Sequence, residues 1–213
     1  MNGRLAVHAL VLCRFSTPCN NTCRTMNHSL LGFALLGLLH HEPMSGYDLR
    51  KIFATTALGS FSDSPGAIYP ALQRMEKQGW VRGEVQATGG MRRRRIFHPT
   101  PAGLVAFKAW LRKPVTRDDV IRRMGDLMLR FAFMDQTLGG EQAAKFLLAL
   151  AEELAAYIPT LKQYLKVHHK EMALSGRLAL ESGIWEYEAR LRWARRAVKI
   201  YHQRHELAQK ERR

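Results

Sequence analysis

The sequence predicts a mainly α-helical protein with one small β-hairpin, divided into two domains near residue 114. Three observations support this prediction. Apolar residues recur at steps of three and four through most of the chain, which is typical of helices. Two short extended runs flank Gly89 and Gly90, which is typical of a hairpin. Lys113 and Pro114 interrupt the helical pattern, and 213 residues are enough for two modest cores.

The composition indicates a polyanionic partner. The chain has 33 Lys and Arg residues against 18 Asp and Glu, which gives a formal net charge of +15. Nucleic acid, an anionic membrane surface and an acidic protein are all compatible with this charge, so charge alone does not choose between them. No run of ~18 apolar residues occurs, so we expect no membrane span and a cytoplasmic protein.

Residues 1–25 are predicted to be a disordered leader or an upstream extension, because Met26 immediately precedes the first strongly patterned segment. All three cysteines lie in this leader, so the main body is expected to use no disulfide. Cys19 and Cys23 have a spacing that two metal ligands could use, but no further cysteine or close histidine pair completes a tetrahedral site. We therefore expect neither a metal ion nor a cofactor.

The first domain, residues 26–113, is predicted to begin with two helices. The run from Leu30 to Leu39 is apolar nearly all round, which indicates a buried helix with Ser29 as its N-cap. Ser45 can cap a second helix. The apolar stripe of that helix is predicted to consist of Tyr47, Leu49, Ile52 and Phe53.

A third helix is predicted between residues 62 and 79. Ser64 is a suitable N-cap, Pro65 a suitable first residue and Gly79 a suitable end. Ser64 is also one of the candidate DNA-binding residues. Pro70 removes a backbone N–H, so we expect an early kink or a delayed start. The core face is predicted to contain Ile68, Leu72 and Met75. The polar face carries hydrogen-bonding and cationic groups suited to base edges and phosphates, namely Tyr69, Gln73, Arg74 and Lys77.

The hairpin follows, with strands predicted at residues 80–86 and 91–98. Four consecutive arginines beside its turn would repel one another unless an anion offsets their charge, and phosphates or a minor groove fit this requirement. These residues are Arg92, Arg93, Arg94 and Arg95. The alternative is a solvated charged loop. Thr100 and Pro101 then begin a helix that ends near Leu111, which completes a winged helix-turn-helix.

The second domain, residues 114–213, is predicted to be helical. Asp118 and Asp119 can open a helix that continues to Phe133, and Pro159 is expected to kink the next one. Two later helices carry apolar seams at alternating steps of three and four. Packing within the chain can use part of these seams, and we assign the rest to a two-fold dimer. The proposed dimer seam consists of Ile184, Tyr187, Leu191 and Val198.

Three ordered motifs resemble the hallmark segments of PadR-type transcriptional regulators: residues 64–72 (SPGAIYPAL), 79–81 (GWV) and 94–103 (RRIFHPTPAG). The long C-terminal half resembles the larger subclass of that family. The resemblance implies a homodimeric repressor that binds palindromic operator DNA, with Tyr69 near the DNA backbone. It also implies release by a small, often aromatic effector. Phe97 and His98 depart from the family, where a second tyrosine-rich strand is common.

Large aromatic residues in segments expected to meet at a domain or subunit junction are the candidates for an effector site. They are Trp110, Phe131, Phe133 and Trp185. The alternative is that these rings only pack in the core or in the dimer seam.

Other functions are less well supported by the residues. No nucleophile with a base, no metal motif and no phosphate-cradling glycine loop occurs, so we do not expect an enzyme. A winged-helix module for protein or RNA interaction is the main alternative, and the arginine-rich wing favours duplex DNA over it. A basic membrane-binding helix at residues 190–213 is weakened by its glutamates and its modest apolar face.

Overall fold

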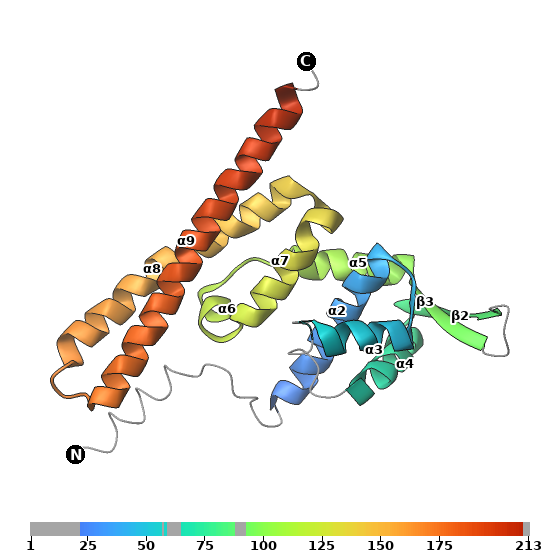
Figure 1. Ribbon diagram of the computed structural model, residues 1–213, viewed down its shortest axis with the longest axis horizontal. Helices are drawn as coiled ribbons and strands as arrows, with labels where there is room; N and C mark the ends of the chain where they lie inside the picture. Colours follow the sequence, from blue (N-terminus) through green and yellow to red (C-terminus); the bar gives the residue numbers. More distant parts are fainter. Residues whose placement is uncertain (1–21, 57, 59–64, 88–92, 211–213) are drawn as a thin grey trace. The chain divides into compact units, whose positions relative to one another are not determined.

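The computed structural model describes residues 22–56, 58, 65–87 and 93–210 (Figure 1). Within these residues the chain divides into two compact units, with the break between Lys113 and Pro114. The predicted fold class is confirmed: a winged helix-turn-helix precedes an all-helical C-terminal region. Among the described helices, none combines the length and the apolar character that crossing a bilayer requires.

The first unit contains helices and a three-stranded antiparallel sheet in the order β1-β3-β2. Its elements are α2 (Thr22–His41), β1 (Met44–Ser45), α3 (Gly46–Thr55), the 3-10 turn η2 (Pro65–Ala67), α4 (Ile68–Lys77), β2 (Val81–Ala87), β3 (Arg93–Pro99) and α5 (Pro101–Leu111).

Helix α2 is the central helix of this unit, as predicted. Its buried residues Leu35, Leu36 and Leu39 pack in a core that also includes Leu72 of α4 and Phe107 of α5. The helix begins at Thr22, so the prediction that Ser29 is its N-cap is wrong. No proline or glycine interrupts residues 22–31, and the backbone therefore stays helical upstream of Ser29. Of the predicted leader, only residues 22–25 lie within the described part of the chain.

Helix α3 begins as predicted. The Ser45 hydroxyl accepts a hydrogen bond from the Asp48 backbone N–H at 3.2 Å, and the Asp48 carboxylate accepts one from the Ser45 backbone N–H at 3.4 Å. This is a reciprocal capping box. Leu49 and Phe53 are buried, but Tyr47 is 57% exposed and is not part of the apolar face.

In the part of the chain that the structure describes, the second unit contains four helices: α6 (Arg117–Arg122), α7 (Met124–Leu138), α8 (Gly140–His168) and α9 (Leu174–Lys210). The two long helices α8 and α9 lie side by side (Figure 1). The prediction of one helix from Asp118 to Phe133 is wrong, because the backbone breaks at Arg123 (φ −134°, ψ 35°). There the Arg123 guanidinium lies 3.2 Å from Asp118 and 2.8 Å from Asp119, both on the preceding helix.

Candidate nucleic-acid interface

The start of α4 is delayed, as Pro70 predicted. Residues Pro65–Ala67 form one 3-10 turn, and the α-helix begins at Ile68. Pro70 is then the third residue of α4, where a backbone N–H would have no partner within the helix. The predicted N-cap Ser64 lies outside the described residues. The helix therefore accepts its proline by beginning just before it.

The end of α4 is fixed by Gly79. Its φ of +71° is in the left-handed region that favours glycine. Its N–H donates to the Glu76 carbonyl at 3.0 Å, and the Trp80 N–H donates to the Met75 carbonyl at 2.8 Å. This pair of bonds is a Schellman motif, which satisfies two carbonyls at the end of the helix and turns the chain into β2.

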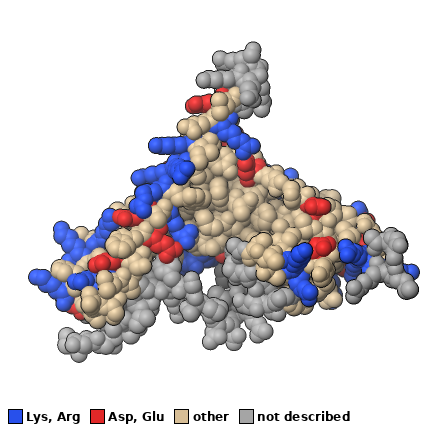
Figure 2. All heavy atoms as spheres, in the orientation of Figure 1, with Lys and Arg blue, Asp and Glu red and all other residues tan. Residues whose placement is uncertain are grey.

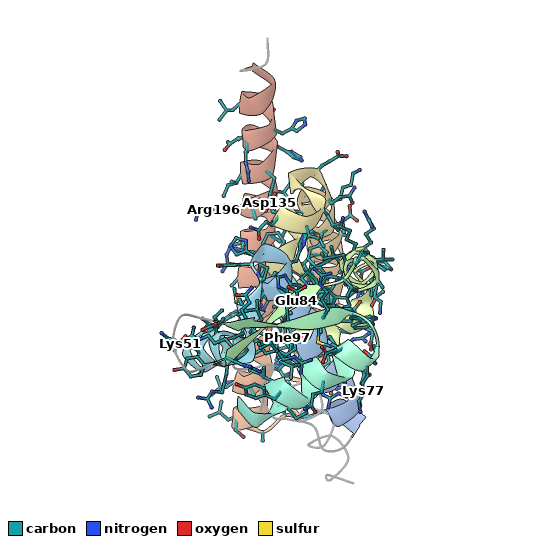
Figure 3. The ribbon with its side chains drawn as sticks, turned by 90° about the vertical axis from the view of Figure 1, so that its right-hand side faces the viewer. Lys51, Lys77, Glu84, Phe97, Asp135 and Arg196 are labelled. Carbon is teal, nitrogen blue, oxygen red and sulfur yellow. The ribbon has the colours of Figure 1, made fainter. Side chains whose placement is uncertain are left out.

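The two faces of α4 are separated as predicted. Ile68, Leu72 and Met75 are buried, so they hold the helix against the core. The four residues of the opposite face are all exposed, and Figure 3 labels Lys77 among them. They are Tyr69, Gln73, Arg74 and Lys77. A short helix with one buried face and one exposed polar face has the form that enters a major groove.

The Tyr69 ring rests on the beginning of α3. A Cβ atom placed on Gly46 would lie 2.6 Å from Cε1 of Tyr69, so only glycine leaves room for the ring in this position. The ring thereby connects α3 and α4, the two helices of the helix-turn-helix, while remaining 46% exposed. This contact was not predicted from the sequence, where the signal for it is a glycine directly after the N-cap Ser45.

The wing is an antiparallel pair whose register runs from Val81 opposite Pro99 to Ala87 opposite Arg93. Because side chains alternate along a strand, Arg93, Arg95 and Phe97 lie on one face and Arg94 lies on the other. Figure 3 labels Glu84 and Phe97, which mark the two faces. Arg93 and Arg94 are exposed, and Arg92 lies outside the described residues. The predicted row of arginines is therefore divided between the two sides of the hairpin.

Arg95 differs from its neighbours because it has an acidic partner on α4. Its Nη2 lies 2.7 Å from Oε1 and 2.8 Å from Oε2 of Glu76. The Gly83 backbone N–H also donates to Oε1 of Glu76, at 3.0 Å. One carboxylate thus contacts both strands of the wing. The sequence predicted that Arg95 binds DNA, and no role was predicted for Glu76.

Residues 35–109, which include all of these elements except the beginning of α2 and the end of α5, match the transcriptional regulator PadR-like family. The chain carries a PadR-like domain. No curated protein matches the chain.

The solved structures that are similar to it include the following three. PadR from Bacillus subtilis in complex with operator DNA is 20% identical, covers 80% of this chain and 98% of that chain, and has a TM-score of 0.39. The same regulator in complex with p-coumaric acid is 17% identical, covers 82% and 97%, and has a TM-score of 0.38. A transcriptional regulator from Thermoplasma acidophilum is 30% identical over 40% of this chain and 80% of its own, with a TM-score of 0.35.

The aromatic residues predicted to bind an effector have different surroundings. Trp110, in the first unit, is buried and stacks on Phe33 with ring centroids 4.6 Å apart. In the C-terminal unit, the rings of Phe131 and Trp193 have centroids 5.5 Å apart. Trp193 lies about two helical turns along α9 from Trp185. Phe133 is half-buried, and Trp185 is 68% exposed. Within this unit Phe131 and Trp185 are therefore not brought together.

A groove of about 730 Å³ lies within the C-terminal unit, where the first turns of α8 meet the C-terminal part of α9. Ala144, Leu148 and Tyr201 contribute its apolar lining. Asp135 and Arg204, which form an ion pair at 2.9 Å, also line it. None of the predicted effector residues lines this groove.

The predicted dimer seam is used within the chain. Ile184, Tyr187 and Val198 are buried along α9, where it packs on α8, and Leu191 is half-buried. Tyr187 meets Tyr157 of α8 edge to face, with ring centroids 5.3 Å apart. These side chains therefore have intramolecular partners.

A different face of α9 carries exposed apolar side chains. At 100° per residue they fall within one stripe along the helix. They are Leu174, Leu178, Trp185, Trp193, Ile200 and Leu207. Figure 2 shows that basic side chains also lie along α9, so positive charge is not confined to the PadR-like domain.

Proposed function

We propose that this protein is a sequence-specific DNA-binding transcriptional regulator that acts as a homodimeric repressor on palindromic operator DNA. The observation that carries the proposal is the exposed polar face of α4 beside a wing whose Arg93 and Arg94 are exposed. Both features lie in the domain that matches the PadR-like family.

The geometry supports a division between reading and positioning. The core holds α4 through its buried face, and a 3-10 turn and a Schellman motif fix its two ends, so its exposed side chains start from a defined backbone. The Gln73 amide can make a bidentate contact to adenine in the major groove. Arg93 can neutralise a phosphate or enter a minor groove but carries little base information by itself.

The decisive experiment recovers bound sequences from random duplex DNA. We expect an inverted repeat whose half-site centres lie about 34–36 Å apart, or at a multiple of that distance, because two recognition helices of a dimer then meet the same side of the duplex. Affinity should fall steeply with salt. Equal affinity for the recovered site and a scrambled duplex contradicts the proposal, and equal affinity for RNA supports a general winged-helix interaction module.

The roles of individual residues can be tested on the recovered site. Gln73→Ala should relax the base preference at one position by about 1–3 kcal/mol, while Arg93→Ala should weaken binding to all sequences alike. Tyr69→Phe should reduce affinity modestly and equally for all sequences, because it removes one hydrogen bond to the DNA backbone. Lys166→Ala removes an equal charge from the C-terminal unit and is the control. An unchanged preference profile in Gln73→Ala would show that Gln73 does not read a base.

The exposed stripe of α9 supports a homodimer. A long row of exposed, large apolar side chains on a helix marks an interaction surface. A second copy presents the same row, and two-fold pairs of identical surfaces are the commonest oligomers. The proposal therefore moves the dimer contact from the buried seam to the face that contains Leu178 and Trp185.

An aromatic effector is the remaining part of the proposal. Its support is the family resemblance together with the aromatic residues and the groove of the C-terminal unit. Tryptophan fluorescence should report titration with phenolic compounds, beginning with p-coumaric acid, and DNA affinity should be measured in the same samples. To lower DNA affinity about a hundredfold, a compound must bind the arrangement that does not bind DNA about a hundredfold more tightly than the arrangement that does. A compound that saturates the protein without changing DNA affinity is not an effector.

A further inference from the structure

We propose that Glu76 and Arg95 form a brace that fixes the angle between α4 and the wing, so that Arg95 supports DNA binding by positioning the wing and does not contact phosphate. The brace consists of the Glu76 carboxylate, the Arg95 guanidinium and the Gly83 backbone N–H. The effect on DNA binding rests on the proposed function, whereas the brace itself can be tested without DNA.

The brace joins three elements through one carboxylate. Both oxygens of Glu76 are within 2.8 Å of Arg95 Nη2, and Oε1 also accepts the Gly83 N–H at 3.0 Å. Glu76 is on α4, Gly83 on β2 and Arg95 on β3. A change in the angle between helix and hairpin would break bonds to both strands at once.

The local sequence leaves room for this arrangement. A Cβ atom on Gly83 would collide with Nε of Arg95, so only glycine allows the guanidinium to lie against β2. Glycine weakens a strand, and a close approach by another group is a physical reason for its presence there. On β3, the Arg95 Cζ lies 5.4 Å from the centre of the buried Phe97 ring. The guanidinium is thus held between Gly83, Phe97 and Glu76.

The alternation of the strand separates Arg95 from Arg94. Arg95 shares a face with Phe97, whose side chain is buried, while Arg94 lies on the other face. The Arg95 and Glu76 side chains are 49% and 30% exposed, and ion pairs this exposed contribute little to global stability. We therefore expect the effect of the brace on wing geometry to exceed its effect on the unfolding equilibrium.

Wing geometry affects DNA binding because α4 and the wing must meet the duplex together. A wing that is already at the right angle does not have to be ordered when the complex forms, and this increases affinity. The brace and direct phosphate contact make opposite predictions for Glu76. If Arg95 contacts phosphate, removing the carboxylate should strengthen binding to a polyanion. If Arg95 is part of a brace, removing the Glu76 carboxylate should weaken DNA binding.

The DNA experiment measures affinity and its salt dependence on the recovered site for Arg95→Ala, Glu76→Ala and the double variant, with Arg93→Ala as the phosphate control. We expect each single change to weaken binding roughly tenfold and the double variant to be no weaker than either, because the two residues act as one unit. The slope of log K against log salt should stay unchanged in Arg95→Ala and fall by about 0.9 in Arg93→Ala. Tighter binding by Glu76→Ala, additive losses, or a reduced slope in Arg95→Ala would overturn the brace.

A second measurement needs no DNA. Amide hydrogen exchange in β2 and β3 should be faster in both Arg95→Ala and Glu76→Ala, because the hairpin opens locally when it is released from α4. Arg82→Ala is the matched control: it removes an arginine paired with Glu84 at 3.1 Å on the same hairpin, but that pair does not reach α4. Unchanged exchange in both brace variants would overturn the brace. If the protein binds no specific DNA, the proposed function fails and exchange alone decides the brace.

Discussion

Asp126, which is half-buried, and Arg130, which is buried, lie one turn apart on α7. Arg130 is 4% exposed, its Cζ lies 5.2 Å from the centre of the Phe146 ring, and its Nη1 donates to the Pro114 carbonyl at 3.4 Å. Burial lowers the pKa of Arg130. Burial also raises the pKa of Asp126 to about 6, against the opposing effect of Arg123. Asp126, the group that titrates, is therefore near Arg130. Arg130 in turn binds the carbonyl of Pro114, the first residue after the break between the two units.

Asp126 should make stability depend on pH. Its pKa is about 6 in the folded state against an ordinary 3.8, so the folded state holds the proton more tightly than the unfolded state. Below about pH 4 the group is protonated in both states and costs no stability; as the pH rises from about 4 to about 6 the free energy of unfolding falls, and this loss stays constant at higher pH. Asp126→Asn is neutral at every pH and should have a higher Tm than the original protein above about pH 7. Circular dichroism melts across this range should show the advantage shrinking to nothing near pH 4, and an advantage that is constant with pH would contradict the assignment.

At the scale of elements, the length of α4 is determined by one residue near each of its ends. Pro70 sets where it begins, and Gly79 sets where it ends. The cost of replacing Gly79 follows from its backbone angle alone, since nothing lies within 4 Å of a Cβ built at this position. The end of the helix also determines where β2 begins and hence where the wing projects.

Gly79→Ala should lower the free energy of unfolding by about 1–2 kcal/mol, because an L-residue in the left-handed region is strained. Urea unfolding monitored by circular dichroism would measure this loss. Gly125→Ala is the matched control, since Gly125 lies in helix α7 and is not among the glycines with positive φ. It should leave stability unchanged or raise it slightly, because alanine is the better helix former. Equal effects of the two substitutions would exclude backbone strain as the cause.

At the scale of the whole molecule, the exposed stripe of α9 is expected to hold two copies together. Trp185→Glu places a charge in the stripe, and it should convert the dimer to a monomer at micromolar concentration without loss of helix, because the side chain is 68% exposed within the chain. Light scattering after gel filtration would measure the mass. Arg195→Glu, on an exposed part of α9 outside the stripe, should leave the dimer intact. A monomeric original protein, or a dimeric Trp185→Glu, would remove α9 from the interface.

The sequence by itself determined the features that depend on neighbours along the chain. The caps at Ser45 and Thr100, the late start of α4 just before Pro70 and its end at Gly79 were all predictable, because each depends on backbone groups only a few residues away. The buried and exposed faces of α4 followed from helical periodicity in the same way.

Only the tertiary structure decided which surfaces and charges meet. Helix α9 carries apolar residues on two faces, and periodicity alone does not state which face α8 covers; the packing buries Ile184 and Tyr187 and leaves Trp185 exposed. The run of arginines likewise predicts charge but not partners. Glu76 and Arg95 are 19 residues apart, and they meet because the turn at Gly79 and the register of β2 and β3 bring the hairpin back against α4. Pairings of this kind depend on how separate elements pack, which local sequence preferences do not specify.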